Sequence, residues 1–353
     1  MNPNTGRGKA AGESVTDRRG RIVNLILLVL LVLCFVISFC TGKYALTLHD
    51  TLAVIRHHLF GGPAGYPSSA ETVFLQVRMP RLLSCILVGA ALSSAGAAYQ
   101  GIFRNPMVSP DLLGASSGSA FGACCGILLG MSYFSMHIVA FLFGLAAVAL
   151  TFAVSSVVSR RENTAMTLIL TGMVVSSLFS AGISITKLLA NPDRELGEIT
   201  FWLMGSMTKL NLKSLPILII PVLVGLVPML LIRYRLNLLS LGEEEARTLG
   251  VNVAALRLVF IVCSTLVTSA SVAACGMVGW IGLVIPHLIR MLIGPDYRHL
   301  LPASVTAGAL FLLMVDNITR VFFQVEVSIG ILTALVGAPF FLFLLMHGKK
   351  GWV

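Results

Sequence analysis

The sequence predicts an all-α integral membrane protein with about ten transmembrane helices. Three observations support this prediction. Apolar runs long enough to cross a bilayer recur from one end of the chain to the other. Charged residues make up 11% of the 353 residues, whereas soluble domains carry about 25%. The apolar runs also lack the alternation of apolar and polar residues that the strands of a membrane barrel require.

The first span follows a polar, basic stretch, residues 1–21, which ends in DRRGR. An apolar run, IVNLILLVLLVLCFVISF, comes directly after it. This run is longer than the apolar core of a signal peptide, and FCTGK at its end offers no small-residue cleavage site. We therefore expect residues 1–21 to form a cytoplasmic tail and the run to be retained as the first transmembrane helix.

Nine further spans follow the same criterion of length and apolarity. The ten predicted spans are residues 22–41, 74–101, 112–130, 135–158, 164–189, 212–232, 254–275, 277–293, 301–322 and 328–347. They form one transmembrane domain, residues 22–347, and a short tail, residues 348–353, follows it.

Lysine and arginine gather in alternate connecting segments, and the positive-inside rule places these segments in the cytoplasm. The residues concerned are Arg104, Arg160, Arg161, Arg233, Arg235, Arg290, Arg298, Lys349 and Lys350. Both chain ends are therefore expected on the cytoplasmic side. The net charge of +10 has the same cause, so it does not indicate binding of nucleic acid.

Seven basic residues depart from this charge rule: Arg78, Arg81, Lys187, Arg194, Lys209, Lys213 and Arg320. Arg78 and Arg81 begin the second span on the outer side, and Arg320 ends the ninth span on that side. Snorkelling toward lipid phosphates would explain a single arginine more readily than two on one helical face. Asp316 precedes Arg320 by four residues, so an ion pair is the simpler interpretation of this acid, and a role in transport is the alternative.

The segment between the second and third spans, RNPMVSPDLLG at 104–114, breaks the helix at membrane depth with two prolines and a glycine. Irregular backbone at that depth is tolerated only where it is buried in protein or lines a cavity. The flanking spans are rich in small residues, which allow close helix packing. The sequence thus indicates either a tightly packed bundle or a translocation path at this break.

A second informative segment is the polar stretch 233–257, the longest on the inner side between two spans. Within it, LGEEEARTLGV predicts a short helix with acidic residues in its first turn and Gly250 as its stop. Leu241, Ala246 and Leu249 would form its apolar face. Such a short helix is unstable alone, so it must dock either on the protein's own inner surface or on a cytoplasmic partner.

No residue pattern predicts a catalytic or metal site. The seven cysteines lie in apolar runs without metal-ligand spacing, and we interpret them as buried hydrophobic residues. An ion-coupled carrier would need several acids within the membrane, and only Asp316 qualifies. The sequence therefore disfavours this class of transporter. His57 and His58 in the outer loop are only a weak indication of a haem-like substrate. The chain also lacks the phosphate-binding loop G-x-x-x-x-G-K-[ST] of ATPases.

Four stretches in order resemble the FecCD family of ABC-importer permeases, whose members import iron–siderophores, haem, vitamin B12 and, in some cases, molybdate. They are RMPRLLSCILVGAALSSAGAAYQGIFRNPMVSPDLLGASSG, LGEEEARTLGV, GMVGWIGLVIPHLIRMLIGPDYRHLLP and VGAPFFLFLL. The resemblance covers about residues 22–347. Two departures are Ser328, at a position where the family usually has proline, and Asn317, where an apolar residue is usual.

The resemblance implies a homodimer of ten-helix subunits in a prokaryotic cytoplasmic membrane, in contact with lipid. Two cytoplasmic ATPase subunits would use ATP and Mg, and an extracytoplasmic substrate-binding protein would dock outside. The chain itself would bind no cofactor and would not be an enzyme. The implied substrate is an iron chelate, either a siderophore or haem, and the alternatives are vitamin B12 and molybdate or tungstate. An ion-coupled carrier remains the alternative outside this family.

The resemblance also implies roles for single residues. The expected docking residues for the binding protein are Arg78, Arg81 and Arg320. The expected coupling residues toward the ATPase are Gly242, Glu243, Ala246, Arg247, Leu249 and Gly250. The expected cytoplasmic gate is formed by Asn105, Pro106 and Met107, with Thr164, Ala165 and Met166 as a second layer.

Overall fold

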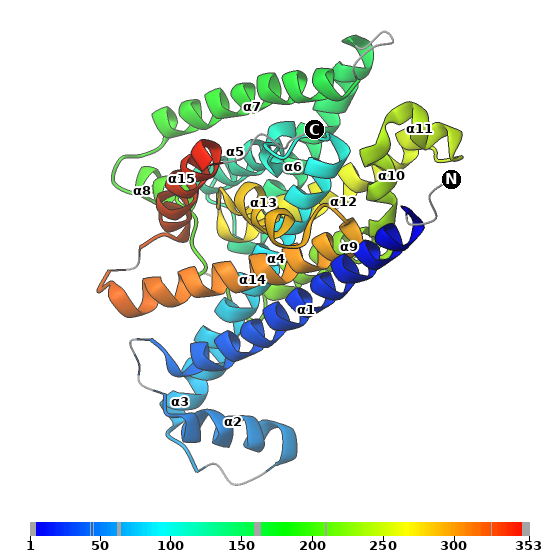
Figure 1. Cartoon of the computed structure of the whole chain (residues 1–353). Helices are drawn as coiled ribbons and strands as arrows, with labels where there is room; N and C mark the ends of the chain where they lie inside the picture. The colour runs from blue at the N-terminus through cyan, green and yellow to red at the C-terminus, as the bar shows by residue number, and fades with distance from the viewer. Residues whose placement is uncertain are drawn as a thin grey trace.

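The computed structural model describes residues 5–42, 44, 46–61, 65–158, 164–208, 210–325 and 327–347. These residues form a bundle of helices without a β-strand (Figure 1). The prediction of an all-α membrane protein is therefore confirmed. The predicted inner-side residues Arg160, Arg161, Lys349 and Lys350, and the tail 348–353, lie outside the described residues.

Each of the ten predicted spans contains a helix, and further short helices lie between the spans. Among the described residues, six regions are long and apolar enough to cross a membrane, and a bent pair supplies a seventh. The six contain α1 (Thr5–Cys40), α4 (Met79–Ile102), α6 (Tyr133–Val158), α7 (Thr164–Leu189), α12 (Val253–Cys275) and α14 (Tyr297–Phe322). In the bent pair, α9 (Leu215–Leu231) meets η3 (Arg233–Arg235) and α10 (Leu236–Leu241) at an angle of 58°.

Three predicted spans are shorter apolar helices: α5 (Ala115–Leu128), α13 (Ile281–Ile293) and α15 (Ile329–His347). The 14 residues of α5 extend over about 21 Å, less than the ~30 Å of a hydrocarbon core. Irregular backbone and the 3₁₀ turn η2 (Pro110–Leu113) directly precede α5.

The centre of the bundle is formed by α4 and α12, whose apolar windows are 83% and 78% buried. Gly89 of α4 faces the backbone of Gly308 on α14, and Gly96 of α4 faces the carbonyl of Gly282 on α13. A Cβ atom at either position would collide with that backbone. The small residues of the second span therefore serve close helix packing, as one of the two interpretations of this stretch expects.

The two ends of the bundle differ in their irregular elements (Figure 1). The short helix α11 (Glu243–Thr248) lies at the end where α1 begins. At the opposite end, α1 leads into α2 (Leu48–Phe60) and α3 (Ser68–Thr72). Helix α1 already starts at Thr5, so the helix includes most of the predicted tail. The start of α1 and α11, both predicted to be cytoplasmic, therefore lie at the same end of the bundle, and the orientation of the bundle in the membrane stays a prediction.

The predicted outer loop 42–73 contains two helices. Thr47 begins α2 with a capping box, in which its hydroxyl and the carboxylate of Asp50 each bond the other's backbone N–H. His58 lies 2.7 Å from Glu71, which ties α2 to α3. This contact with Glu71 gives no support for a haem contact at His57 and His58, which stays a prediction.

Candidate functional site

The end of the bundle that the charge rule places outside, called the outer end below, contains a cluster of three arginines and one aspartate. Arg81 Nε lies 2.7 Å from Asp316 Oδ1, and Arg320 Nε lies 2.8 Å from Asp316 Oδ2. Asp316 is fully buried. The predicted pair between Asp316 and Arg320 is therefore confirmed. The partnership with Arg81, 235 residues away in sequence, was not predicted, because no local spacing connects the two helices.

Arg78 and Arg320 also bond the end of α1 and the residues that follow it. Arg78 donates to the carbonyls of Phe39 and Tyr44. Arg320 donates to the carbonyls of Ser38 and Thr41, at 3.2 and 3.0 Å. The last carbonyls of a helix lack partners within the helix and carry partial negative charge, so arginine is well suited to this position.

The placement of Arg78 and Arg81 depends on a π-helical turn. The helix that carries them runs as α3, then the π-helical segment η1 (Val73–Arg78), then α4. Pro80 has no N–H to donate in the first turn of α4, and the wider turn of η1 directly precedes it. The N–H of Met79 bonds the carbonyl of Phe74 across this turn.

Together, three guanidinium groups and one carboxylate leave the outer cluster with a surplus of two positive charges. Yet Arg78 is only 4% exposed and Arg81 only 9%. The structure brings together the three arginines that the resemblance assigns to docking. It also shows that their side chains bond to other residues of the same chain, namely Asp316 and backbone carbonyls at and after the end of α1. Their docking role stays a prediction.

Asn317 lies beside the outer cluster and faces α1. Its amide nitrogen donates to Ser38 Oγ at 2.6 Å, and its oxygen accepts from Thr41 Oγ1 at 3.0 Å. It also accepts from Arg320 Nη2 at 2.5 Å. The polar residue at this usually apolar position therefore joins α14 to the end of α1.

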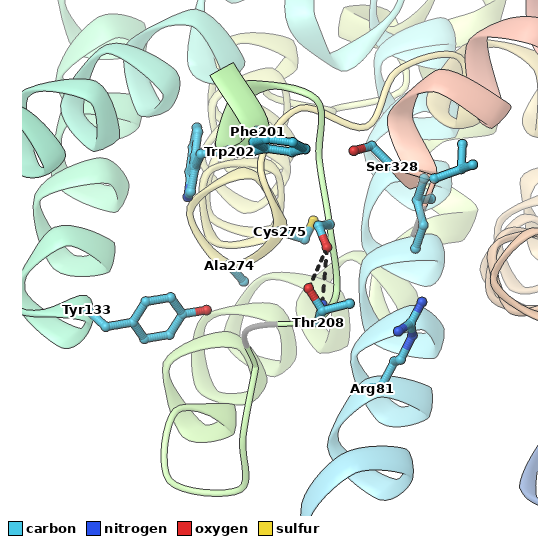
Figure 2. Close-up of a pocket in the computed structure, with 11 residues that line it drawn as sticks. Arg81, Tyr133, Phe201, Trp202, Thr208, Ala274, Cys275 and Ser328 are labelled. Atoms are coloured by element: carbon cyan, nitrogen blue, oxygen red, sulfur yellow. Dashed lines mark hydrogen bonds between the residues drawn. The ribbon is translucent and has the colours of Figure 1, made fainter. Parts of the chain in front are cut away.

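A pocket of about 190 Å³ opens next to Arg81 (Figure 2). Its walls come from α4, the start of α6, α8 (Glu195–Leu203), the end of α12 and the start of α15. Tyr133 and Arg81 reach into it from opposite sides, and Thr208 lies between them (Figure 2). Ser328, noted in the sequence only as a missing proline, contributes a further hydroxyl.

The backbone around this pocket is fixed by hydrogen bonds between distant segments. The N–H of Ser206 donates to the carbonyl of Cys275 at 2.8 Å, and the N–H of Ile329 donates to the carbonyl of Gly205 at 3.0 Å. The hydroxyls of Ser206 and Thr208 lie 2.8 Å apart. One guanidinium and several hydroxyls around a small volume can hydrogen-bond an anion. Sequence reasoning missed Tyr133 and Thr208, because neither stands out in a local pattern.

The predicted gate residues lie at the break between α4 and η2. Arg104 has a positive φ of 48°, and Asn105 then accepts from the N–H of Met107 at 2.9 Å. Met107 is 49% exposed, and Met166 at the start of α7 is 56% exposed. The side chain of Thr164 lies outside what the structure describes, and Ala165 is half-buried. Pro106 is half-buried as well.

Helix α7 packs directly on η2, because Gly172 faces the carbonyl of Leu112. The two predicted layers of the gate therefore lie on neighbouring elements. A constriction at a dimer axis would require a second copy, and this role remains a prediction.

The predicted short helix on the inner side is present as α11. It begins after Gly242, whose φ of 132° favours glycine, and it ends at Gly250, whose φ is 79°. Ala246 is fully buried, whereas Leu249 is 60% exposed. Of the predicted apolar face, Ala246 thus packs against the protein itself, whereas Leu249 is exposed at the surface of the single chain. The side chains of Leu241 and Glu243 lie outside the described set.

No group of three or more histidine, cysteine, aspartate or glutamate side chains in the described part of the chain could hold a metal ion. Of the seven cysteines that were predicted to be buried, Cys85, Cys124, Cys263 and Cys275 are buried, whereas Cys34, Cys40 and Cys125 are half-buried. Anion binding, rather than metal ligation, is the chemistry that the described polar groups support.

Comparison with known proteins gives concordant results. The model of the FecCD transport family matches residues 30–347. A molybdate import system permease protein of Haemophilus influenzae is 40% identical over 92% of this chain and 95% of its own length. A protein of Helicobacter pylori named as a probable iron chelatin transport system permease is 37% identical over 80% of this chain and 85% of its own length.

Among solved structures, a metal-chelate type ABC transporter in an inward-facing conformation superposes with a TM-score of 0.82. It is 40% identical in sequence, and the match covers 92% of this chain and 99% of that one. The fold and the order of elements described above are therefore those of a solved transporter subunit.

Proposed function

The chain belongs to the FecCD transport family of ABC-importer permeases, and we propose that it passes a small metal oxyanion of the molybdate class into the cell. The pocket beside Arg81 carries this proposal. Its volume of about 190 Å³ and its guanidinium and hydroxyl groups suit a compact tetrahedral anion. The 40% identity to a molybdate permease over nearly the whole chain supports the same substrate class.

An iron chelate, the leading expectation from the sequence, is the second candidate. Its support is the Helicobacter relative and the solved metal-chelate type transporter. Uptake of labelled molybdate and of a labelled iron–siderophore by cells that carry the complete importer distinguishes the two candidates. We expect molybdate uptake that excess iron chelate does not suppress; the reverse pattern would reassign the substrate.

Variants of the pocket sharpen this test. Tyr133→Phe combined with Thr208→Val removes two hydroxyls from the pocket walls and should lower molybdate uptake about a hundredfold or more, since each lost hydrogen bond to a charged group costs about 1.5–3 kcal/mol. Thr200→Val is the matched control, because the Thr200 hydroxyl bonds its own helix at the carbonyl of Leu196. Equal uptake by both variants would exclude the pocket from the path.

The permease works, on this proposal, as a homodimer in the cytoplasmic membrane. The face of α7 that carries Met166, Leu170 and Val174 is apolar and exposed in the single chain. An apolar groove of about 570 Å³ also follows α15, lined by Met204, Met277 and Leu335 among others. Both surfaces suit a second subunit and a shared path, with Asn105 and Met107 at its inner mouth.

Cysteines at 105 or 107 should crosslink between subunits. The absence of a crosslink in every nucleotide state would contradict this gate.

ATP hydrolysis takes place in separate subunits in this family, and we propose that α11 transmits it. The exposed Leu249 and the buried Ala246 support this role, since one side of α11 is anchored and the other is presented outward. Arg247→Glu should release the ATPase in a pull-down or abolish coupled transport. Normal ATPase binding together with normal transport would contradict the proposal.

A further inference from the structure

A second, larger pocket lies at the inner end of the bundle. It has a volume of about 600 Å³ and is formed by α1, the junction of α9 with η3, and the first turn of α14. Figure 1 shows the start of α14 beside the N-terminal part of α1. Its charged side chains are Arg21, Arg233, Arg298 and Asp17, and His299 lies among them.

Positive charge is in excess in this inner pocket. Asp17 is the one carboxylate among its described lining residues, and it is engaged twice, 2.5 Å from Arg21 Nη2 and 2.6 Å from His299 Nε2. Arg298 is exposed, and its guanidinium has no hydrogen-bond or ion-pair partner among the described side chains. The pocket thus has two more arginines than carboxylates.

The backbone frame of the inner pocket is fixed. Arg233 Nε donates to the carbonyl of Arg298 at 3.0 Å, and its Nη1 donates to the carbonyl of Leu230 at 2.5 Å. Asn24 Nδ2 donates to the carbonyl of His299 at 3.2 Å. These bonds connect α1, α9 and α14 before any ligand arrives, so the arginines converge on a preformed space.

The pocket borders apolar surface. Leu231, which lines it, is 70% exposed, and Leu25 and Ile26 on the next turn of α1 are 63% and 51% exposed. Helices this apolar and this exposed face the acyl chains of the bilayer. An occupant that has phosphate oxygens and also acyl chains would satisfy both parts of this site, whereas a free soluble anion would satisfy only the arginines.

From these contacts we infer that the inner pocket binds the phosphate headgroup of an anionic phospholipid of the inner leaflet. Arg298 and Arg21 bind the phosphate oxygens, Arg233 completes the cationic wall, and the acyl chains extend along Leu231 and α1. Arginine is suited to this task because its planar fork pairs with phosphate oxygens. Basic pockets between helices at the cytoplasmic face are a general form of lipid site.

The test is native mass spectrometry of the full-length protein from micelles that contain phosphatidylglycerol or phosphatidylcholine. We expect retained phosphatidylglycerol and little retained phosphatidylcholine. Arg21→Gln with Arg298→Gln should weaken phosphatidylglycerol binding about thirty-fold, because each basic residue near an anionic lipid contributes a factor of about five. Arg18→Gln with Arg19→Gln removes the same charge from exposed positions of α1 outside the pocket and should change binding little.

Three further results decide the inference. Arg298→Lys keeps the charge and should keep most of the lipid binding. This result would show that the Arg→Gln variants lose binding because the pocket loses charge and not because the protein fails to fold. Inorganic phosphate at millimolar concentration should not displace the lipid; full displacement would show that the pocket takes a soluble anion instead. Equal phosphatidylglycerol binding by the pocket variant and its matched control would overturn the assignment.

Discussion

The outer arginine cluster and the inner pocket contain the same charged groups in opposite surroundings. Each has three arginines and one described aspartate, but Asp316 is fully buried, whereas the side chain of Asp17 is 46% exposed. The outer arginines bond to a carboxylate and to the end of α1. In the inner pocket, the guanidinium of Arg298 is exposed and has no ion-pair partner among the described side chains.

The difference arises from where the arginines lie on their helices. Arg81 belongs to α4, which is surrounded by other helices, so its charge must be paired inside the protein. Arg21 belongs to α1, whose apolar window is only 11% buried. Burial thus makes the outer set part of the fold, with Arg81 also lining a pocket, whereas exposure makes the inner set available to ligands. The predictions below test this contrast.

The largest effect is expected from Asp316→Asn, which leaves two buried arginines without a counter-charge. Breaking a buried pair in this way costs about 3–5 kcal/mol. Asp17→Asn breaks the contacts of a half-exposed carboxylate and should cost less than about 1 kcal/mol. Thermal unfolding of the purified protein in detergent measures both. A similar loss of stability in the two variants would contradict the contrast.

A smaller effect is expected on the partner protein. If the surplus charge of the outer cluster attracts carboxylates of the binding protein, Arg78→Gln should slow its association about tenfold at low salt, and less at high salt. Arg78→Lys should retain fast association, and Arg298→Gln at the inner end should have no effect. Association rates by surface plasmon resonance decide this point; salt-independent rates equal to wild type would reduce the cluster to a structural role.

The smallest effect concerns pH at the outer face. The hydrogen bond from the Thr47 hydroxyl holds the pKa of Asp50 below its ordinary value. A carboxylate with a lowered pKa in the folded state stabilises at pH values above its unfolded pKa and loses this contribution as pH falls through the folded pKa. The start of α2 should therefore loosen below about pH 4.

A spin label at Leu52→Cys reports this loosening as increased mobility. Asp50→Asn, which cannot ionise, should remove the pH dependence while the inner end stays unchanged. Mobility that is independent of pH in the wild type would contradict the role of the capping box.

The sequence was sufficient for the helices and not for the tertiary contacts. Each of the ten predicted spans contains a helix, although α1 begins at Thr5 and not at residue 22. Gly250 correctly marked the end of α11. The spacing of Asp316 and Arg320 predicted their pair because both lie on one helix. Arg81, Tyr133 and Thr208 could not be connected in this way, since their partners lie on other helices. The outer loop was also predicted without α2, because a short amphipathic helix gives no membrane-length signal.

The most direct test of the whole account is transport by the reconstituted importer. Vesicles that contain this permease are combined with its ATPase, its binding protein, ATP and Mg, and the uptake of labelled molybdate is measured. We predict accumulation only when all components are present. Uptake that persists without the ATPase and follows an ion gradient would contradict the assignment as an ATP-driven permease.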